Sequence, residues 1–222
     1  MSTDQEAVFR AGEGDAWYRR NAAALRDRDD PVMQVLRGLD RRDRIRSVAD
    51  LGCSNGWRLA ALRPDLPAAR RLAGCDPSGA AVAAGTEAWP DLELQVGSLA
   101  RVPFAGAFDL VLVSFVFYLV DRPGLARAVA EVDRVVDAGG VLVLADFCAD
   151  APFAVPYHHR RDVALLSHKA DHAAPFRALG YRETFRLEYD HDCPRLPGLV
   201  STQVPDRMNR SAVAVLVKAA VG

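Results

Sequence analysis

The hydrophobic residues of this chain follow two periodicities that alternate from residue 47 onward. Short apolar runs that end in glycine or in an acidic residue predict buried strands, whereas apolar residues three or four positions apart predict helices. We expect strands at 47–51, 72–75, 92–96, 108–114, 141–145, 181–189 and 211–219. We expect helices between them at 57–62, 78–89, 123–137 and 171–179. The alternation predicts an α/β fold around a largely parallel sheet.

The N-terminal residues predict a helical extension in front of this domain. We expect helices at 4–12, 16–28 and 32–39. Gly12 and Gly14 are expected to end the first helix, and Asp15 is placed to cap the second. We therefore divide the chain into an extension at 1–43 and an α/β domain at 44–222.

Two long segments have no clear periodicity, at 146–170 and 190–210. Loops of this length in a compact domain tend to carry function. We expect both segments to be irregular and to lie near a functional site.

A loop of small residues follows the first strand, with Gly52 and Gly56 at its ends. Gly52 can take the positive φ needed to leave the strand, and Gly56 lets a ligand approach the main chain. The first amides of the following helix then favour an anionic group over the loop. Asp76 ends the second strand about 20 residues further on, where a dinucleotide-binding fold places the acid that holds a ribose.

These segments resemble two motifs of the class I S-adenosylmethionine-dependent methyltransferases. VADLGCSNG is similar to the first motif, although Ser54 stands at the middle glycine, and GCDPSGAAV is similar to the second. The resemblance implies a Rossmann-like seven-stranded, mostly parallel sheet with an antiparallel last strand and helices on both faces. It implies S-adenosylmethionine as the cofactor, bound by Asp50, Gly52, Cys53, Ser54, Asn55, Gly56, Asp76, Pro77, Ser98, Leu99, Ser114 and Phe115. At Ser98 the family commonly has an acid that meets the adenine, so a backbone contact from Leu99 is the alternative.

The acceptor of the methyl group is expected between the extension and the carboxyl ends of the central strands. In this family such N-terminal helices often form a lid, and GDAWYRRN resembles a segment of some small-molecule members. The expected acceptor-binding residues are Trp17, Tyr18, Arg20, Asn21, Tyr118, Tyr157 and Lys169. A packing role for Trp17 and a solvated face for the arginines are the alternatives.

Four of the five histidines lie between residues 158 and 172. Because an imidazole titrates near neutral pH, His158, His159 and His168 are candidate bases, with surface histidines of no function as the alternative. His168 and His172 are four residues apart without an identifiable third ligand, so we expect no metal site.

The composition of the chain limits the classes of partner that it is expected to bind. The 222 residues include 28 basic and 29 acidic side chains, and the formal charge of −1 does not favour nucleic acid or an anionic membrane. The four cysteines lack paired metal spacing and a disulfide framework, and no apolar signal or membrane-length segment occurs. We therefore expect a cytoplasmic protein with a small-molecule acceptor, and a homodimer is left open.

The favoured function is methyl transfer to nitrogen or oxygen of a sugar, a nucleoside or another secondary metabolite. An RNA or protein methyltransferase is the first alternative. A non-catalytic or nicotinamide-nucleotide-binding domain on a similar sheet is the second.

Overall fold

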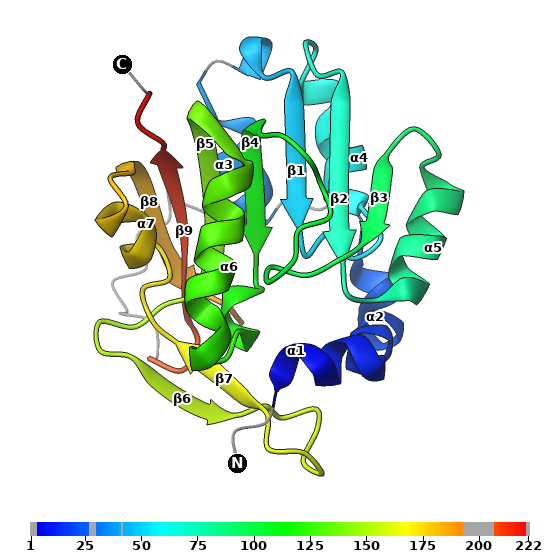
Figure 1. Ribbon diagram of the computed structural model, residues 1–222, viewed down its shortest axis with the longest axis vertical. Coiled ribbons are helices and arrows are strands. Elements are labelled where there is room, and N and C mark those ends of the chain that lie inside the picture. Colours follow the sequence, from blue (N-terminus) through cyan, green and yellow to red (C-terminus); the bar gives the residue numbers. More distant parts are fainter. Residues whose placement is uncertain (1–3, 27–29, 41, 193–206, 221–222) are drawn as a thin grey trace.

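The computed structural model describes residues 4–26, 30–40, 42–192 and 207–220, which fold around one seven-stranded sheet (Figure 1). The strand order is β3-β2-β1-β4-β5-β9-β8. The strands are β1 (Ser47–Leu51), β2 (Arg71–Asp76), β3 (Glu93–Val96), β4 (Phe108–Ser114), β5 (Val136–Phe147), β8 (Arg182–Asp190) and β9 (Arg210–Val217). β1 to β5 pair in parallel, whereas β9 pairs antiparallel with both β5 and β8. The predicted fold class is confirmed.

Helices cover both faces of the sheet. They are α3 (Pro31–Arg37), α4 (Trp57–Leu62), α5 (Gly79–Ala88), α6 (Arg122–Val135) and α7 (Ala174–Ala178), with short turns at η2 (Ala22–Ala24), η3 (Arg42–Arg44), η4 (Arg63–Asp65) and η5 (Phe117–Leu119). Alternate residues of β4 enter different cores: Val111 and Val113 pack with α6 and α7, whereas Leu110 and Leu112 pack with α3 and α4. The continuous apolar run therefore marks a central strand, as the sequence predicts.

The N-terminal extension differs from its prediction in where the helices break. α1 (Gln5–Val8), a π-helical turn η1 (Phe9–Glu13) and α2 (Gly14–Asn21) follow one another, with a kink at Gly12, whose φ is 148°. Gly14 does not interrupt the helix, because its missing side chain lets α2 approach Ser78, whose nitrogen would lie 3.3 Å from an added Cβ. Asp15 does not cap its own helix but bonds to the start of α5. Residues 27–29 of the predicted second helix lie outside the described residues.

The boundary between α6 and β5 also differs from the prediction. The helix ends at Val135 instead of Asp137, and β5 begins at Val136 instead of Val141. Val136 pairs with Phe108, and the register then shifts before Leu110. Gly139, with φ of 76°, lies within the strand and allows this irregularity.

The segment at 146–170 is partly ordered as strands instead of being irregular throughout. β6 (Phe153–Pro156) and β7 (Leu166–Lys169) pair antiparallel as a separate two-stranded sheet. Of the second predicted loop, residues 193–206 lie outside the described residues. Among the described helices, none combines the length and apolar character that a membrane crossing requires.

Candidate functional site

The loop between β1 and α4 has the left-handed backbone that the sequence predicts. Gly52 and Gly56 have φ of 88° and 77°, and Ser54, at the position of the middle glycine, also has a positive φ of 52°. A Cβ added to Gly52 would lie 2.2 Å from Cγ2 of Val116, which follows β4. The residue after β4 therefore packs closely on the loop, and the backbone is strained at Ser54.

Asp76 lies beside this loop at the carboxyl end of β2. Its Oδ2 accepts a hydrogen bond from the Ser54 amide at 2.8 Å, and its Oδ1 accepts one from the Ser78 amide at 2.9 Å. Burial raises the pKa of Asp76 to about 6, and the two amide hydrogen bonds oppose this rise. The carboxylate thus joins the loop after β1 to the start of α5.

Four buried polar atoms surround this loop without a hydrogen-bond partner among the described residues. They are Asp50 Oδ1, Ser54 Oγ, Asn55 Oδ1 and Ser114 Oγ, from the end of β1, the loop and the end of β4. Burial also raises the pKa of Asp50 to about 7, opposed by the charge of Arg58. Buried polar atoms normally have partners, so this group fits a ligand that supplies hydrogen-bond donors, such as an ammonium or a hydroxyl group.

The N-terminal extension lies against the carboxyl ends of β1 to β3, where the arrowheads in Figure 1 point toward α1 and α2. Asp15 Oδ1 accepts from Ser78 Oγ at 2.6 Å and from the Ala80 amide at 3.1 Å. Ser98, predicted to meet the adenine, donates its hydroxyl to Glu6 Oε1 at 2.6 Å. Leu99 is buried in the core beside it. The extension therefore covers the predicted cofactor residues on β2 and after β3.

A buried carboxylate joins the extension to the segment between β6 and β7. Glu13 is fully buried, and its Oε1 accepts from Arg20 Nη2 at 2.5 Å and from the Tyr157 hydroxyl at 3.1 Å. Arg160 Nη1 lies 3.6 Å from Oε2. The structure thus brings together two predicted acceptor residues, Arg20 and Tyr157. The sequence did not indicate Glu13, because an isolated acid on a short helix gives no signal of burial.

The other predicted residues of the extension lie apart from this contact. Trp17 and Tyr18 are partly buried, and the Asn21 side chain donates to the Trp17 carbonyl oxygen at 2.9 Å, within their own helix. Their role toward an acceptor stays a prediction.

The three predicted catalytic histidines do not lie together. His158 and His159 are exposed in the turn after β6, with ring centroids 3.7 Å apart, and the ring of His159 packs on Tyr157. His168 is in β7, next to Lys169, and neighbouring residues of a strand point to opposite faces. Burial, followed by the charge of His172, lowers the pKa of His168. Their catalytic role stays a prediction.

Aromatic rings gather at the carboxyl ends of β4 and β5. Phe147 packs against Phe115 and Tyr118, with centroid distances of 5.4 and 5.2 Å, and against His191 at 4.8 Å. Phe115 has a left-handed φ of 55°, which is uncommon for a residue with a side chain. The Lys169 ammonium lies 2.9 Å from the centroid of the Phe147 ring. Sequence analysis missed Phe147, although its place just after a predicted strand was a usable signal.

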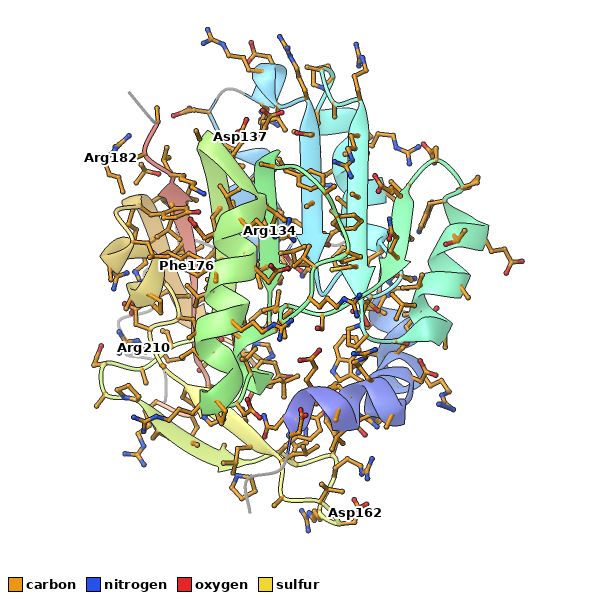
Figure 2. The ribbon with its side chains drawn as sticks, in the orientation of Figure 1. Arg134, Asp137, Asp162, Phe176, Arg182 and Arg210 are labelled. Atoms are coloured by element: carbon orange, nitrogen blue, oxygen red, sulfur yellow. The ribbon has the colours of Figure 1, made fainter. Side chains whose placement is uncertain are left out.

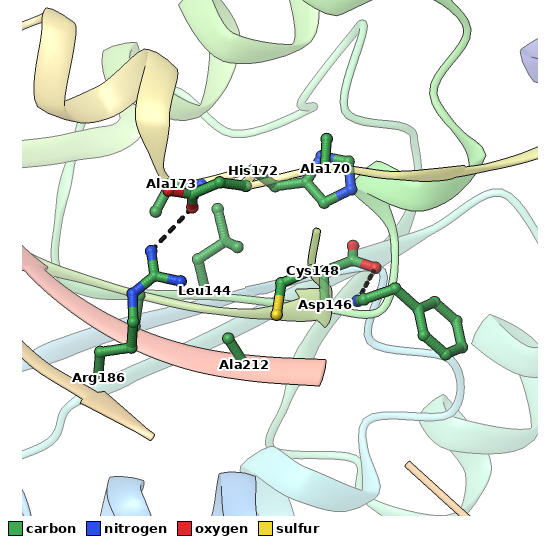
Figure 3. Close-up of a pocket in the computed structure, with 11 residues that line it drawn as sticks. Leu144, Asp146, Cys148, Ala170, His172, Ala173, Arg186 and Ala212 are labelled. Atoms are coloured by element: carbon green, nitrogen blue, oxygen red, sulfur yellow. Dashed lines mark hydrogen bonds and ion pairs between the residues drawn. The ribbon is translucent and has the colours of Figure 1, made fainter. Parts of the chain in front are cut away.

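Two cavities flank the end of β5. The smaller, of about 10 Å³, has room for about one water, and Figure 3 shows Asp146, Cys148, His172 and Arg186 around it. The larger, of about 520 Å³, is lined by charged residues of α7, β8 and β9. Its side chains pair with one another, as Arg186 with Asp171 and Arg210 with Asp150 at 2.8 and 2.9 Å. We assign no ligand to it, and no group of potential metal ligands occurs within the described ranges.

Comparisons with known sequences place this arrangement among methyltransferases. The methyltransferase domain family matches residues 48–140. A probable S-adenosylmethionine-dependent methyltransferase of Mycolicibacterium smegmatis is 29% identical over 165 residues, covering 73% of this chain and 56% of that protein. The polyketide synthase ThaQ of Burkholderia thailandensis is 30% identical over 145 residues, covering 60% of this chain and 6% of that protein. The chain spans about half of the first relative and a small part of the second.

Solved structures share the fold at low sequence identity. The 1,6-didemethyltoxoflavin-N1-methyltransferase of Burkholderia thailandensis, solved with 1,6-didemethyltoxoflavin and S-adenosylhomocysteine, has a TM-score of 0.71 at 14% identity, covering 99% of this chain and 92% of that one. A putative methyltransferase in complex with the Trm112 methyltransferase activator of Haloferax volcanii has a TM-score of 0.68 at 18% identity, covering 94% and 96%. At these identities the likeness concerns the fold alone.

Proposed function

We propose that this chain, whose residues 48–140 match the methyltransferase domain family, is a class I S-adenosylmethionine-dependent methyltransferase that uses S-adenosylmethionine to methylate nitrogen or oxygen of a small molecule. The observation that carries this proposal is the group of four unpartnered polar atoms around the loop after β1, beside the Asp76 carboxylate. This group has the chemistry needed to hold both the amino-acid end and the ribose of the cofactor.

Each part of the cofactor would meet a different element. Asp50, Ser54 and Ser114 would hold the amino-acid end, because their unpartnered oxygens can accept from an ammonium or bond a carboxylate through a hydroxyl. Asp76 would hold the ribose, since a carboxylate that accepts two amide bonds still has free lone pairs. Ser98 or the Leu99 backbone would meet the adenine. The remaining predicted residues, Gly52, Cys53, Asn55, Gly56, Pro77 and Phe115, would shape the walls of the site.

The bound cofactor supplies an activated methyl group, so the protein needs to align an acceptor, exclude water and remove a proton where the acceptor carries one. The contact of Glu13 with Arg20 and Tyr157 supports the proposal that residues 1–43 act as a lid. We place the acceptor under this lid, near Tyr118 and Lys169. A small acceptor is favoured by the balanced charge of the chain, and the toxoflavin methyltransferase of similar fold is a precedent for one.

The three described cysteines, Cys53, Cys75 and Cys148, are free and buried. Free thiols are the rule in reducing compartments. We therefore propose that the protein works in the cytoplasm.

Calorimetry with S-adenosylhomocysteine and, separately, with NADH tests the proposed cofactor. We expect the first to bind and the second not to bind, whereas binding of NADH alone would overturn the proposal. The acceptor is then sought by incubating metabolite extracts with a donor that carries an isotopically labelled methyl group. Mass spectrometry should detect the label in a small molecule, and label found only in RNA or protein would exclude a small-molecule acceptor.

A further inference from the structure

Lys169 is a buried cation that has no anionic partner among the described residues. It is the last residue of β7 and only 5% exposed. No hydrogen bond or ion pair joins its ammonium to any residue in the described part of the chain, and its contact is the face of the Phe147 ring. A lysine is almost never buried unless it is paired, so this position needs an explanation beyond packing.

The surroundings place this amine on the ligand side of the sheet. The Phe147 ring that it touches packs against Phe115, which directly follows β4, and against Tyr118 in η5. Ser114, with its unpartnered hydroxyl, directly precedes Phe115. Open α/β sheets bind their ligands at the carboxyl ends of the strands, so Lys169 lies where a methyl acceptor would meet the cofactor.

The identity of the residue is informative because lysine is rare in this chain. Of the 28 basic residues only Lys169 and Lys218 are lysines, and all others are arginines. Lys218 is paired, with its Nζ 3.0 Å from Asp133 Oδ1 and bonded to two backbone carbonyl oxygens. An arginine stays protonated in proteins, whereas a lysine amine can lose its proton and act as a base.

The charged groups around Lys169 permit such a role. Asp146 at the end of β5 and Asp192 after β8 attract the ammonium from a distance, and His172 faces Asp146 from the segment before α7. Burial outweighs both carboxylates and lowers the pKa of Lys169 to about 8. About a tenth of the molecules therefore carry the neutral amine at pH 7.

We propose that Lys169 is the base of the reaction and that the acceptor is a phenol or a heteroaromatic compound with an acidic O–H or N–H. This inference rests on the proposed function. The Lys169 amine takes the acceptor's proton, and the acceptor oxygen or nitrogen forms a bond to the donor methyl carbon. The sulfur–carbon bond breaks, and its electron pair stays on sulfur. Phe115 and Tyr118 would pack on the acceptor ring, whereas His158 and His159 are exposed in the turn after β6.

The first test measures the titration of the two lysines directly. Protein labelled with [¹³C]lysine and saturated with S-adenosylhomocysteine gives two lysine signals in an NMR spectrum, and Lys169→Arg assigns them. We expect the Lys169 signal to titrate near pH 8. Catechol added at pH 9 should move the Lys169 signal toward its protonated position, because a phenolate bound beside the amine stabilises the ammonium form and raises its pKa. Titration of the Lys169 signal near the ordinary lysine pKa of about 10.4, or no response to catechol, would overturn the inference.

The second test separates a base from a fixed positive charge. With catechol and labelled S-adenosylmethionine, we expect Lys169→Arg to lower kcat/KM at least about 100-fold, the usual contribution of a general base. The matched control Lys218→Arg keeps the cation beside Asp133 and should retain activity. Full activity of Lys169→Arg would show that charge alone suffices and would contradict the inference. Failure of S-adenosylhomocysteine to bind the wild-type protein would instead refute the proposed function.

Discussion

Replacing Asp76 by alanine removes the carboxylate that joins the loop after β1 to the start of α5. The amides of Ser54 and Ser78 then lose their acceptor, and the cofactor loses a charged group for its ribose hydroxyls. A hydrogen bond to a charged group contributes about 1.5–3 kcal/mol, so the loss of one such bond to the ribose weakens binding at least about tenfold. We expect this decrease in calorimetric titrations with S-adenosylhomocysteine.

The same carboxylate predicts how cofactor affinity depends on pH. Ribose hydroxyls donate to the ionised form, and the pKa of Asp76 in the free protein is raised to about 6. Protonation therefore competes with binding below pH 6, and affinity should fall about tenfold per pH unit there. In Asp76→Asn this fall should be absent, because the amide does not titrate.

The control is Asp137→Ala, at the far end of the molecule from α1 and α2 (Figure 2). Asp137 is exposed, and among the described residues its carboxylate bonds only to the neighbouring Ala138 amide, so its removal should leave affinity unchanged. Wild-type affinity in a folded Asp76→Ala variant would refute the assignment of the ribose to this carboxylate.

Three further predictions concern the loop and the histidines. Gly52→Ala should lower the free energy of unfolding in urea by about 2 kcal/mol or more, because it adds both left-handed backbone strain and a clash with Val116. The control Gly106→Ala should show the backbone strain alone, because Gly106 also has a positive φ, of 76°, but has open space around it. The pKa of Asp50 is raised to about 7, so the folded protein binds this proton more tightly than the unfolded chain, and wild-type stability should fall as the pH rises from about 4 to 7. Asp50→Asn should flatten this pH dependence of stability. An equally steep profile in the variant would exclude Asp50 as the cause. Alanine at His158 or His159 should lower turnover without changing cofactor affinity if either acts on the acceptor, and unchanged turnover in both variants would remove them from the site.

The sheet could be predicted from the sequence because its signals are local. Each parallel strand is a short apolar run closed by a glycine, an acid or a serine, and the loop at Gly52 and Gly56 needs its glycines for a positive φ. The role of Asp76 could be predicted for the same reason, because its position at the end of β2 determines where its carboxylate lies. These features depend on few distant contacts, and the match of residues 48–140 to the methyltransferase domain family agrees with the resemblance that they support.

The lid contacts could not be predicted because they join residues far apart in the chain. Asp15 has the sequence context of a cap for its own helix but bonds to α5, more than 60 residues away. Glu13 contacts Tyr157 and Arg160, which come from the segment between β6 and β7, and this contact buries it. The pairing of β6 with β7 was missed for a related reason, since each strand is four residues long and alternates weakly.

The most direct test of the central claim is a crystal structure of the protein with S-adenosylhomocysteine. We expect the amino-acid end of the ligand on the unpartnered oxygens of Asp50, Ser54 and Ser114, and the ribose hydroxyls on the Asp76 carboxylate. A ligand bound elsewhere, with these oxygens still without partners, would contradict it.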